Sequence, residues 1–153
     1  MDQLMRGLMA DTLSMAGVIG EIRPGECGKA VAVKGEGTAY RCTVFYEGFE
    51  AVWKAQFTDV DSGGGWTTAQ YRAWPVTGVL TAKAVYAAHG WNTDKGQQPR
   101  CDKMPRVFRA EAGKATAYKC QILLSQCSNG TWHFRWSDRS VWINDEGRVD
   151  FRS

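Results

Sequence analysis

Two copies of one short motif constrain the fold of this chain more than any other feature. The pentapeptide Thr38-Ala39-Tyr40-Arg41-Cys42 returns as Thr116-Ala117-Tyr118-Lys119-Cys120. Each copy is followed by a tryptophan, an aromatic residue four positions later and a Thr/Ser-Asp pair, at Trp53–Asp59 and Trp132–Asp138. The recurrence predicts a tandem duplication within the 153 residues.

Apolar and polar residues alternate within each copy, which is the period of a half-buried strand. The first copy is expected to bury Tyr40, Cys42, Val44, Tyr46, Trp53, Ala55 and Phe57. The second copy is expected to bury Tyr118, Cys120, Ile122, Leu124, Trp132, Phe134 and Trp136. The turn residues Glu47-Gly48 and Cys127-Ser128-Asn129-Gly130 predict that each pair of strands is a hairpin.

Further strands are expected on both sides of each hairpin. The upstream candidates are Lys29–Lys34 and Arg106–Glu111. The downstream candidates are Trp66–Trp74 and Val141–Phe151, and Asp145-Glu146-Gly147 would break the second of these. Each copy therefore predicts three or four antiparallel strands.

Two helices are predicted from apolar residues at three- and four-residue spacing. The first covers about residues 2–20, and Gly20 and Pro24 would end it. Its apolar stripe is Leu4, Met5, Leu8, Met9, Thr12 and Met15. The second helix connects the copies over about residues 76–91, although Val79–Tyr86 also has the composition of a strand. Asn92–Arg100 is expected to be an exposed loop.

The resulting fold class is α+β. We expect a single domain, residues 1–153, in which a helix plus a three- to four-stranded antiparallel unit occurs twice with pseudo-twofold symmetry. Repeat one covers about residues 26–75, and repeat two covers about residues 100–153. One unit alone would leave its aromatic face uncovered, so we expect the two copies to fold only together.

The amino-terminal stretch is apolar enough to raise the question of a signal peptide. Asp2, Arg6 and Asp11 interrupt its apolar residues, so we expect a helix of the folded domain instead. No segment has the length of apolar sequence that crosses a bilayer. These features predict a soluble, cytoplasmic protein that does not enter a membrane.

Five cysteines are present, an odd number that cannot pair completely within one chain. Cys27/Cys42 and Cys101/Cys120 occupy equivalent places in the two copies and could pair, which would leave Cys127 over. A cytoplasmic location favours free thiols over such disulfides. The sequence has no two close Cys or His pairs of the kind that hold structural zinc, so no metal is expected.

The polar faces of the predicted strands collect basic residues. They are Arg41, Lys54, Lys119, His133 and Arg135. Because basic groups with neighbouring amides suit a polyanion, this face predicts a non-catalytic binding protein for nucleic acid or another anionic ligand. The formal net charge of +3 is mild, so the positions of the charges and not their total support this hypothesis. A solvated polar sheet face is the alternative interpretation.

A protein partner is the second functional hypothesis. An open sheet leaves edge strands, and tryptophans outside the matched blocks are candidates for exposure. These tryptophans are Trp66, Trp74, Trp91 and Trp142. The chain would then be a protein interaction module or a small inhibitor of a protein partner.

Other chemistry finds little support in the sequence. Asp59–Gly65 ends in three glycines and could hold a phosphate or a cation, but it lacks the Lys-Ser/Thr of a P-loop, and a hairpin connection is the preferred interpretation. Cys127 near His133 has no recognisable orienting partner, so no catalytic residue is predicted. We expect neither an enzyme nor a bound cofactor.

Overall fold

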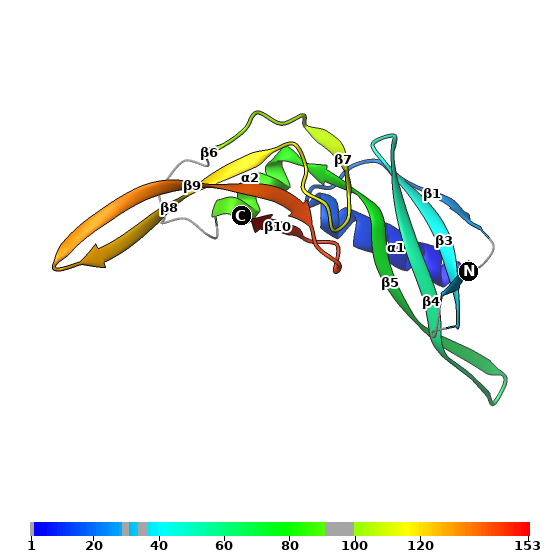
Figure 1. The fold of residues 1–153 in the computed structure, drawn as a ribbon. Coiled ribbons are helices and arrows are strands. Elements are labelled where there is room, and N and C mark those ends of the chain that lie inside the picture. Colours follow the sequence, from blue (N-terminus) through cyan, green and yellow to red (C-terminus); the bar gives the residue numbers. More distant parts are fainter. Residues whose placement is uncertain (1, 29–30, 34–36, 91–99) are drawn as a thin grey trace.

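The computed structural model describes residues 2–28, 31–33, 37–90 and 100–153. Over these residues the chain forms two helices and ten strands (Figure 1). Their order is α1 (Asp2–Ala16), β1 (Ile22–Cys27), β2 (Val31–Val33), β3 (Gly37–Tyr46), β4 (Phe49–Gly63), β5 (Trp66–Thr81), α2 (Ala82–Gly90), β6 (Arg100–Cys101), β7 (Val107–Glu111), β8 (Lys119–Ser128), β9 (Thr131–Ile143) and β10 (Val149–Arg152).

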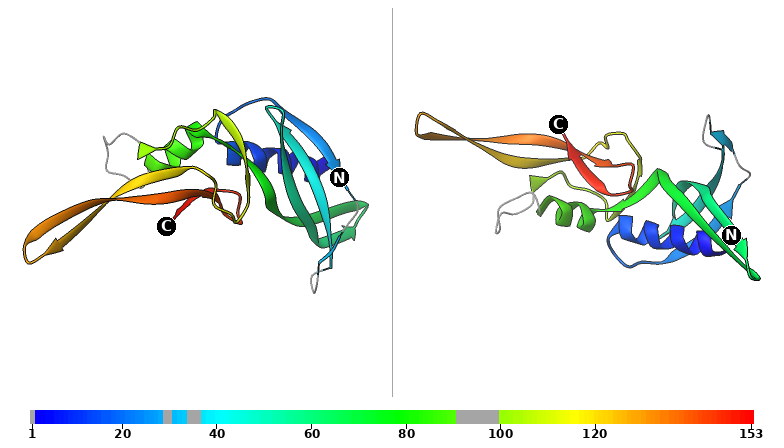
Figure 2. Two further views of the ribbon diagram at one scale, coloured as in Figure 1. Left: turned by 45° about the horizontal axis from the view of Figure 1, so that its top comes forward. Right: turned by 90° about the horizontal axis from the view of Figure 1, so that it is seen from below.

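The strands form two antiparallel sheets. The first has the order β1-β3-β4-β5-β7, with β2 also paired to β3, and the second has the order β10-β9-β8-β6. Helix α1 packs against β1, β3 and β5, whereas α2 contacts β5 and β10. Figure 2 shows the two sheets at opposite ends of the molecule, with a long hairpin projecting from each. The α+β class with antiparallel sheets is confirmed.

The predicted stripe of the first helix faces the core. Leu4, Leu8, Thr12 and Met15 are buried along one side of α1. The helix ends at Ala16 and not near residue 20, because Gly17 adopts a positive φ of 68° and its N–H bonds to the carbonyl of Leu13. Glycine at this position is the usual way to end a helix, since it has no Cβ to clash.

The segment between the copies is strand before it is helix. β5 continues through Pro75 to Thr81, so the helix expected over residues 76–91 is wrong in its first turns, and only α2 remains. From Thr77 to Thr81, β5 pairs with β7, and Val79 and Leu80 are completely buried here. Thr81 marks the change, because its Oγ1 accepts a hydrogen bond from the N–H of Ala84 as a helix N-cap does.

Three two-residue turns close the hairpins. Glu47-Gly48, Gly64-Gly65 and Asn129-Gly130 all have positive φ at both residues, the geometry whose twist suits paired strands. The segment Asp59–Gly65 is therefore the end of a hairpin, as preferred from the sequence. Three further boundaries agree with prediction in part: β2 lies within Lys29–Lys34, β5 includes Trp66–Trp74, and a break separates β9 from β10.

Strand β7 joins the two sheets. It lies within the strand expected upstream of the second hairpin, and it pairs with β5 of the first sheet. The chain after β7 then crosses between sheets: Ala112 donates a hydrogen bond to the carbonyl of Val76, and Gly113 donates one to that of Ile143. A side chain at Gly78 would meet Met15 and Ile143, so this glycine allows α1 and β9 to meet at the junction.

The second hairpin has a different register from the first. Cys42 pairs with Trp53, but Cys120 pairs with Arg139, and Trp132 pairs with Cys127 near the turn. The two tryptophans of the repeated series are therefore not in equivalent places. The expected burial of Trp132, Phe134 and Trp136 is wrong, because β8 and β9 extend beyond the part of the sheet that other elements cover.

Candidate functional site

Two disulfides replace the expected free thiols. Cys27 is bonded to Cys42, and Cys101 is bonded to Cys120. In each case the bond crosses two paired strands, β1 with β3 and β6 with β8. Both pairs were candidates from their equivalent positions, and the expectation of thiols is corrected because antiparallel pairing places the two cysteines side by side. Cys127 is the free, exposed cysteine of the described residues.

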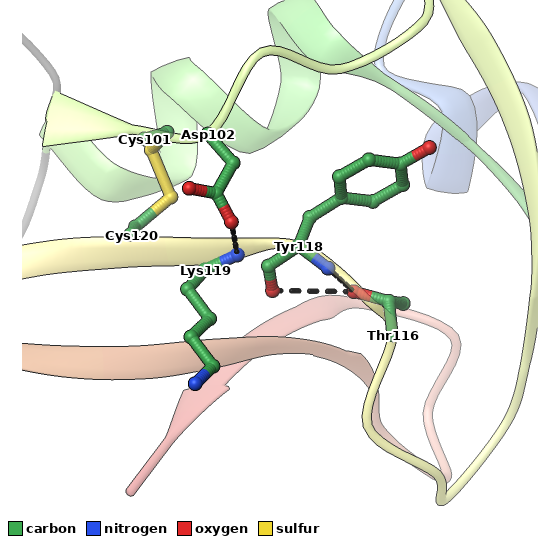
Figure 3. Close-up of a disulfide and its surroundings, with 6 residues drawn as sticks. All are labelled: Cys101, Asp102, Thr116, Tyr118, Lys119 and Cys120. Atoms are coloured by element: carbon green, nitrogen blue, oxygen red, sulfur yellow. Dashed lines mark hydrogen bonds between the residues drawn. A yellow bond between two sulfur atoms is a disulfide. The ribbon is translucent and has the colours of Figure 1, made fainter.

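The second disulfide fixes the short strand β6 to the base of β8 (Figure 3). Next to it, the Asp102 carboxylate accepts a hydrogen bond of 2.8 Å from the N–H of Lys119. The N–H of Asp102 also donates one of 2.8 Å to the carbonyl of Lys119. These bonds hold the backbone of the second pentapeptide, while the ammonium of Lys119 points away from the disulfide.

His89 of α2 lies buried beside this disulfide. Its ring packs against that of Phe151 with 5.6 Å between centroids. Burial lowers the pKa of His89, and a smaller effect of the Gln121 backbone raises it. That backbone contact falls outside hydrogen-bond geometry, so neither ring nitrogen has a hydrogen-bond partner among the described residues. His89 was not predicted as a site residue, since a lone histidine in a helix carries no sequence signal.

The end of the β8–β9 hairpin projects from the body (Figures 1 and 2). We call residues 123–136 the arm. Every residue from Ser125 to Trp136 is exposed. Only the two strands of the hairpin pair with each other here, from Leu123 with Trp136 to Ser128 with Thr131. The arm therefore offers both of its faces to a partner.

One face of the arm is aromatic. Trp132, Phe134 and Trp136 alternate along β9 and remain 61 %, 63 % and 40 % exposed; we call these three residues the aromatic face. The guanidinium of Arg100 lies over the Trp136 ring, 4.0 Å from its centroid. On the same side, Gln121 donates a hydrogen bond of 2.8 Å to Asp138. The side chains nearest the body are thus held in place, whereas the outer rings are open.

The five basic residues predicted as a site lie in separate places. Arg41 and Lys54 are exposed cross-strand partners on the outer face of the first sheet. Lys119 is exposed in the second sheet and shares its face with Gln121 and Asp138. A single strip of basic residues with no acid beside it is therefore absent from the described structure.

His133 and Arg135 lie on the arm but on its other face. His133 pairs with Gln126, and Arg135 pairs with Leu124. Lys119 pairs with Ser140, and this pair lies on the other face of the β8–β9 hairpin. The structure thus joins Arg41 to Lys54 and His133 to Arg135, but does not join either pair to Lys119. His133 and Arg135 instead lie on the face of the arm opposite to the aromatic face.

The tryptophans that were expected to be exposed are not those of the arm. Trp74 and Trp142 are partly buried, while the Trp66 side chain and Trp91 lie outside the described residues. One sequence signal could have identified the exposed rings: the Asn129-Gly130 turn lies further from Cys120 than Glu47-Gly48 lies from Cys42. A longer hairpin from the same base must extend further.

Among the described residues, neither helix has the length and apolar composition needed to span a membrane. Comparison of the chain with protein-family models, with curated proteins and with solved structures finds no significant match.

Proposed function

We propose that this protein is a non-catalytic binding module that docks onto another protein through the arm. The observation that carries the proposal is the aromatic face, three large rings exposed on one side of a projecting hairpin. Tryptophan supplies much of the binding energy at protein interfaces, and a contiguous exposed apolar patch is typical of an interaction site. Trp132 and Phe134, which are 61 % and 63 % exposed, bury little of their ring surface within the fold.

The charge of the arm indicates the chemistry of the partner. Residues 123–136 contain Arg135 and His133 but no Asp or Glu. Arg100 adds a guanidinium against the Trp136 ring. The best complement is therefore a protein with an apolar cleft bordered by carboxylates, where the rings are desolvated and the cations pair at the rim.

The proposal includes the origin of the fold. In each half a helix precedes a strand whose cysteine is bonded to the pentapeptide cysteine. We infer a tandem duplication with pseudo-twofold symmetry that these disulfides anchor, and in which the second hairpin has lengthened into the arm. The two disulfides also favour an oxidising compartment over the cytoplasmic location inferred from the sequence.

A second candidate function is binding of an anionic ligand or nucleic acid on the first sheet. Arg41 and Lys54 lie side by side, and Trp74 is the next cross-strand neighbour of Lys54. Neither basic group forms an ion pair with an acid of the described residues. Free cations beside a partly buried ring suit phosphate and base contacts.

The first test removes the aromatic face. The variant Trp132→Ala/Phe134→Ala/Trp136→Ala should fold like the wild type, because these side chains are exposed. Its affinity for a partner captured from the native extract should fall by about 30-fold or more, since a hot-spot truncation costs about 2 kcal/mol or more. The measurement is a titration of the purified partner, with tryptophan fluorescence reporting protection of the rings.

The matched control is Arg41→Ala/Lys54→Ala, which changes exposed residues far from the arm. It should retain the partner after nuclease treatment. If the arm variant binds as tightly as the wild type, docking through the arm is wrong. Loss of binding on nuclease treatment, together with a salt-dependent loss in the Arg41/Lys54 variant, would support the anionic ligand instead.

A further inference from the structure

We propose that His89, Cys101 and Cys120 form a zinc-binding site once the Cys101–Cys120 disulfide is reduced. One nitrogen of His89 and the two sulfurs all lie within 4.8 Å of one another. Among the described residues this is the only such cluster of three His, Cys, Asp or Glu side chains. The proposal is independent of docking by the arm.

The distances are close to those of a zinc site. Zn–S bonds of about 2.3 Å and Zn–N bonds of about 2.0 Å place two sulfurs roughly 3.8 Å apart, and a sulfur and a nitrogen roughly 3.5 Å apart, in a tetrahedral site. After reduction the sulfurs must move apart to that separation, and because the three ligand atoms lie within 4.8 Å of one another, the histidine nitrogen must approach a sulfur by no more than about 1.3 Å. Rotation of the cysteine side chains would supply these shifts without moving the backbone, in which β6 and β8 pair at Arg100 with Gln121 and at Cys101 with Cys120.

The buried imidazole is the second observation that points to a ligand. His89 is fully buried, and both ring nitrogens lack a hydrogen-bond partner among the described residues. Leaving such a polar group unpaired costs about 1 to 3 kcal/mol. A metal ion bound at one nitrogen would satisfy it. Two cysteines and one histidine with a water molecule in the fourth position is a known zinc ligand set, and the half-buried Cys101 leaves a path for water.

Opening the Cys101–Cys120 disulfide requires two electrons, which a reductant must supply. A trialkylphosphine breaks the S–S bond and becomes the phosphine oxide with oxygen from water, while each sulfur takes up a proton. In a cell, a protein dithiol supplies the same two electrons by thiol–disulfide exchange and becomes a disulfide. Zinc then replaces the two thiol protons, which go to solvent, and the imidazole donates a nitrogen lone pair.

The first disulfide provides an internal control. Cys27 and Cys42 are also cross-strand partners, but they do not belong to any cluster with a third ligand in the described chain. The experiment reduces the wild type with a phosphine, adds Zn²⁺, and treats the protein with iodoacetamide before mass spectrometry. Zinc should protect the partly exposed Cys101 from alkylation by about 10-fold or more, whereas the fully buried Cys120 is shielded with or without zinc. The partly exposed Cys27 and the exposed Cys127 should react at the same rate with or without zinc, whereas the fully buried Cys42 is shielded in both cases.

Cobalt tests the role of the histidine. Reduced wild type should bind one Co²⁺ per chain, with sulfur-to-cobalt charge-transfer absorption and the strong visible bands of tetrahedral Co²⁺. His89→Ala should weaken cobalt affinity by at least about 10- to 100-fold, the loss typical even of an outer-shell change. The matched control His133→Ala, which replaces the exposed histidine of the arm, should bind like the wild type.

Each outcome decides for or against the site. Alkylation of Cys101 at the same rate with and without zinc overturns it, and so does an identical cobalt spectrum in His89→Ala. If the reduced chain loses its circular dichroism signal, added zinc should restore the signal in the wild type but not in His89→Ala, because metal affinity is then folding free energy. Restoration in both proteins, or in neither, contradicts the proposal.

Discussion

Replacing Trp53 by alanine should lower the free energy of unfolding by about 3 to 5 kcal/mol. The side chain is 2 % exposed, lies between α1 and the first sheet, and donates a hydrogen bond of 3.0 Å from Nε1 to Thr12 Oγ1. The turn at Gly147 closes over the ring, since a Cβ there would lie 3.3 Å from Trp53 Cη2. Truncation would leave a large cavity where three parts of the chain meet.

The matched control is Trp132→Ala, which removes the tryptophan at the corresponding position of the repeated series. Because Trp132 is 61 % exposed, its loss should change the free energy of unfolding by no more than about 0.5 to 1 kcal/mol. Urea denaturation of both variants, monitored by circular dichroism, gives the comparison. Similar losses in the two variants would contradict the register described here.

Removing either disulfide should destabilise the fold by about 3 kcal/mol. Cys27–Cys42 closes a loop with a sequence separation of 15 residues, and Cys101–Cys120 closes one of 19 residues. Each bond limits the conformations of the unfolded chain, and the cost of its loss grows only slowly with loop length. The double variants Cys27→Ala/Cys42→Ala and Cys101→Ala/Cys120→Ala should therefore lose similar amounts.

The measurement is denaturation without reductant. The midpoints are compared on the condition that the free energy of unfolding depends equally steeply on denaturant concentration in all variants. Cys127→Ala is the control, and it should unfold at the wild-type midpoint because this cysteine is exposed and unpaired. Addition of a reductant should shift the midpoint of the wild type well below that of either double variant. A wild type that is insensitive to reductant would show that the disulfides do not stabilise the fold.

Local patterns were enough to predict the parts of the fold that local chemistry controls. The spacing of Leu4, Leu8 and Thr12 predicted the buried side of α1, and the structure confirms it. Glu47-Gly48 and Asn129-Gly130 predicted hairpin turns, and both adopt positive φ. In the first hairpin, alternation also identified Cys42 and Trp53 correctly as buried.

The candidate site depended on information beyond local pattern. Equivalent positions in the repeat identified the two cysteine pairs, but could not decide between thiols and disulfides, because oxidation depends on the approach of β1 to β3 and of β6 to β8. Similarly, no local signal places His89 beside Cys101 and Cys120. Three elements that are separated in the chain must pack before these groups meet.

The sequence by itself determined the helix periodicity, the turns and the alternation of faces along each strand, because each of these depends on neighbours a few residues away. Only the tertiary structure decided which face is covered. In both strands the tryptophan side chain lies on the other face from the basic residue that follows it, Lys54 after Trp53 and His133 after Trp132. Helix α1 covers Trp53, but no described element covers Trp132. Burial is a contact between distant segments, so two similar strands became a core strand and an exposed arm.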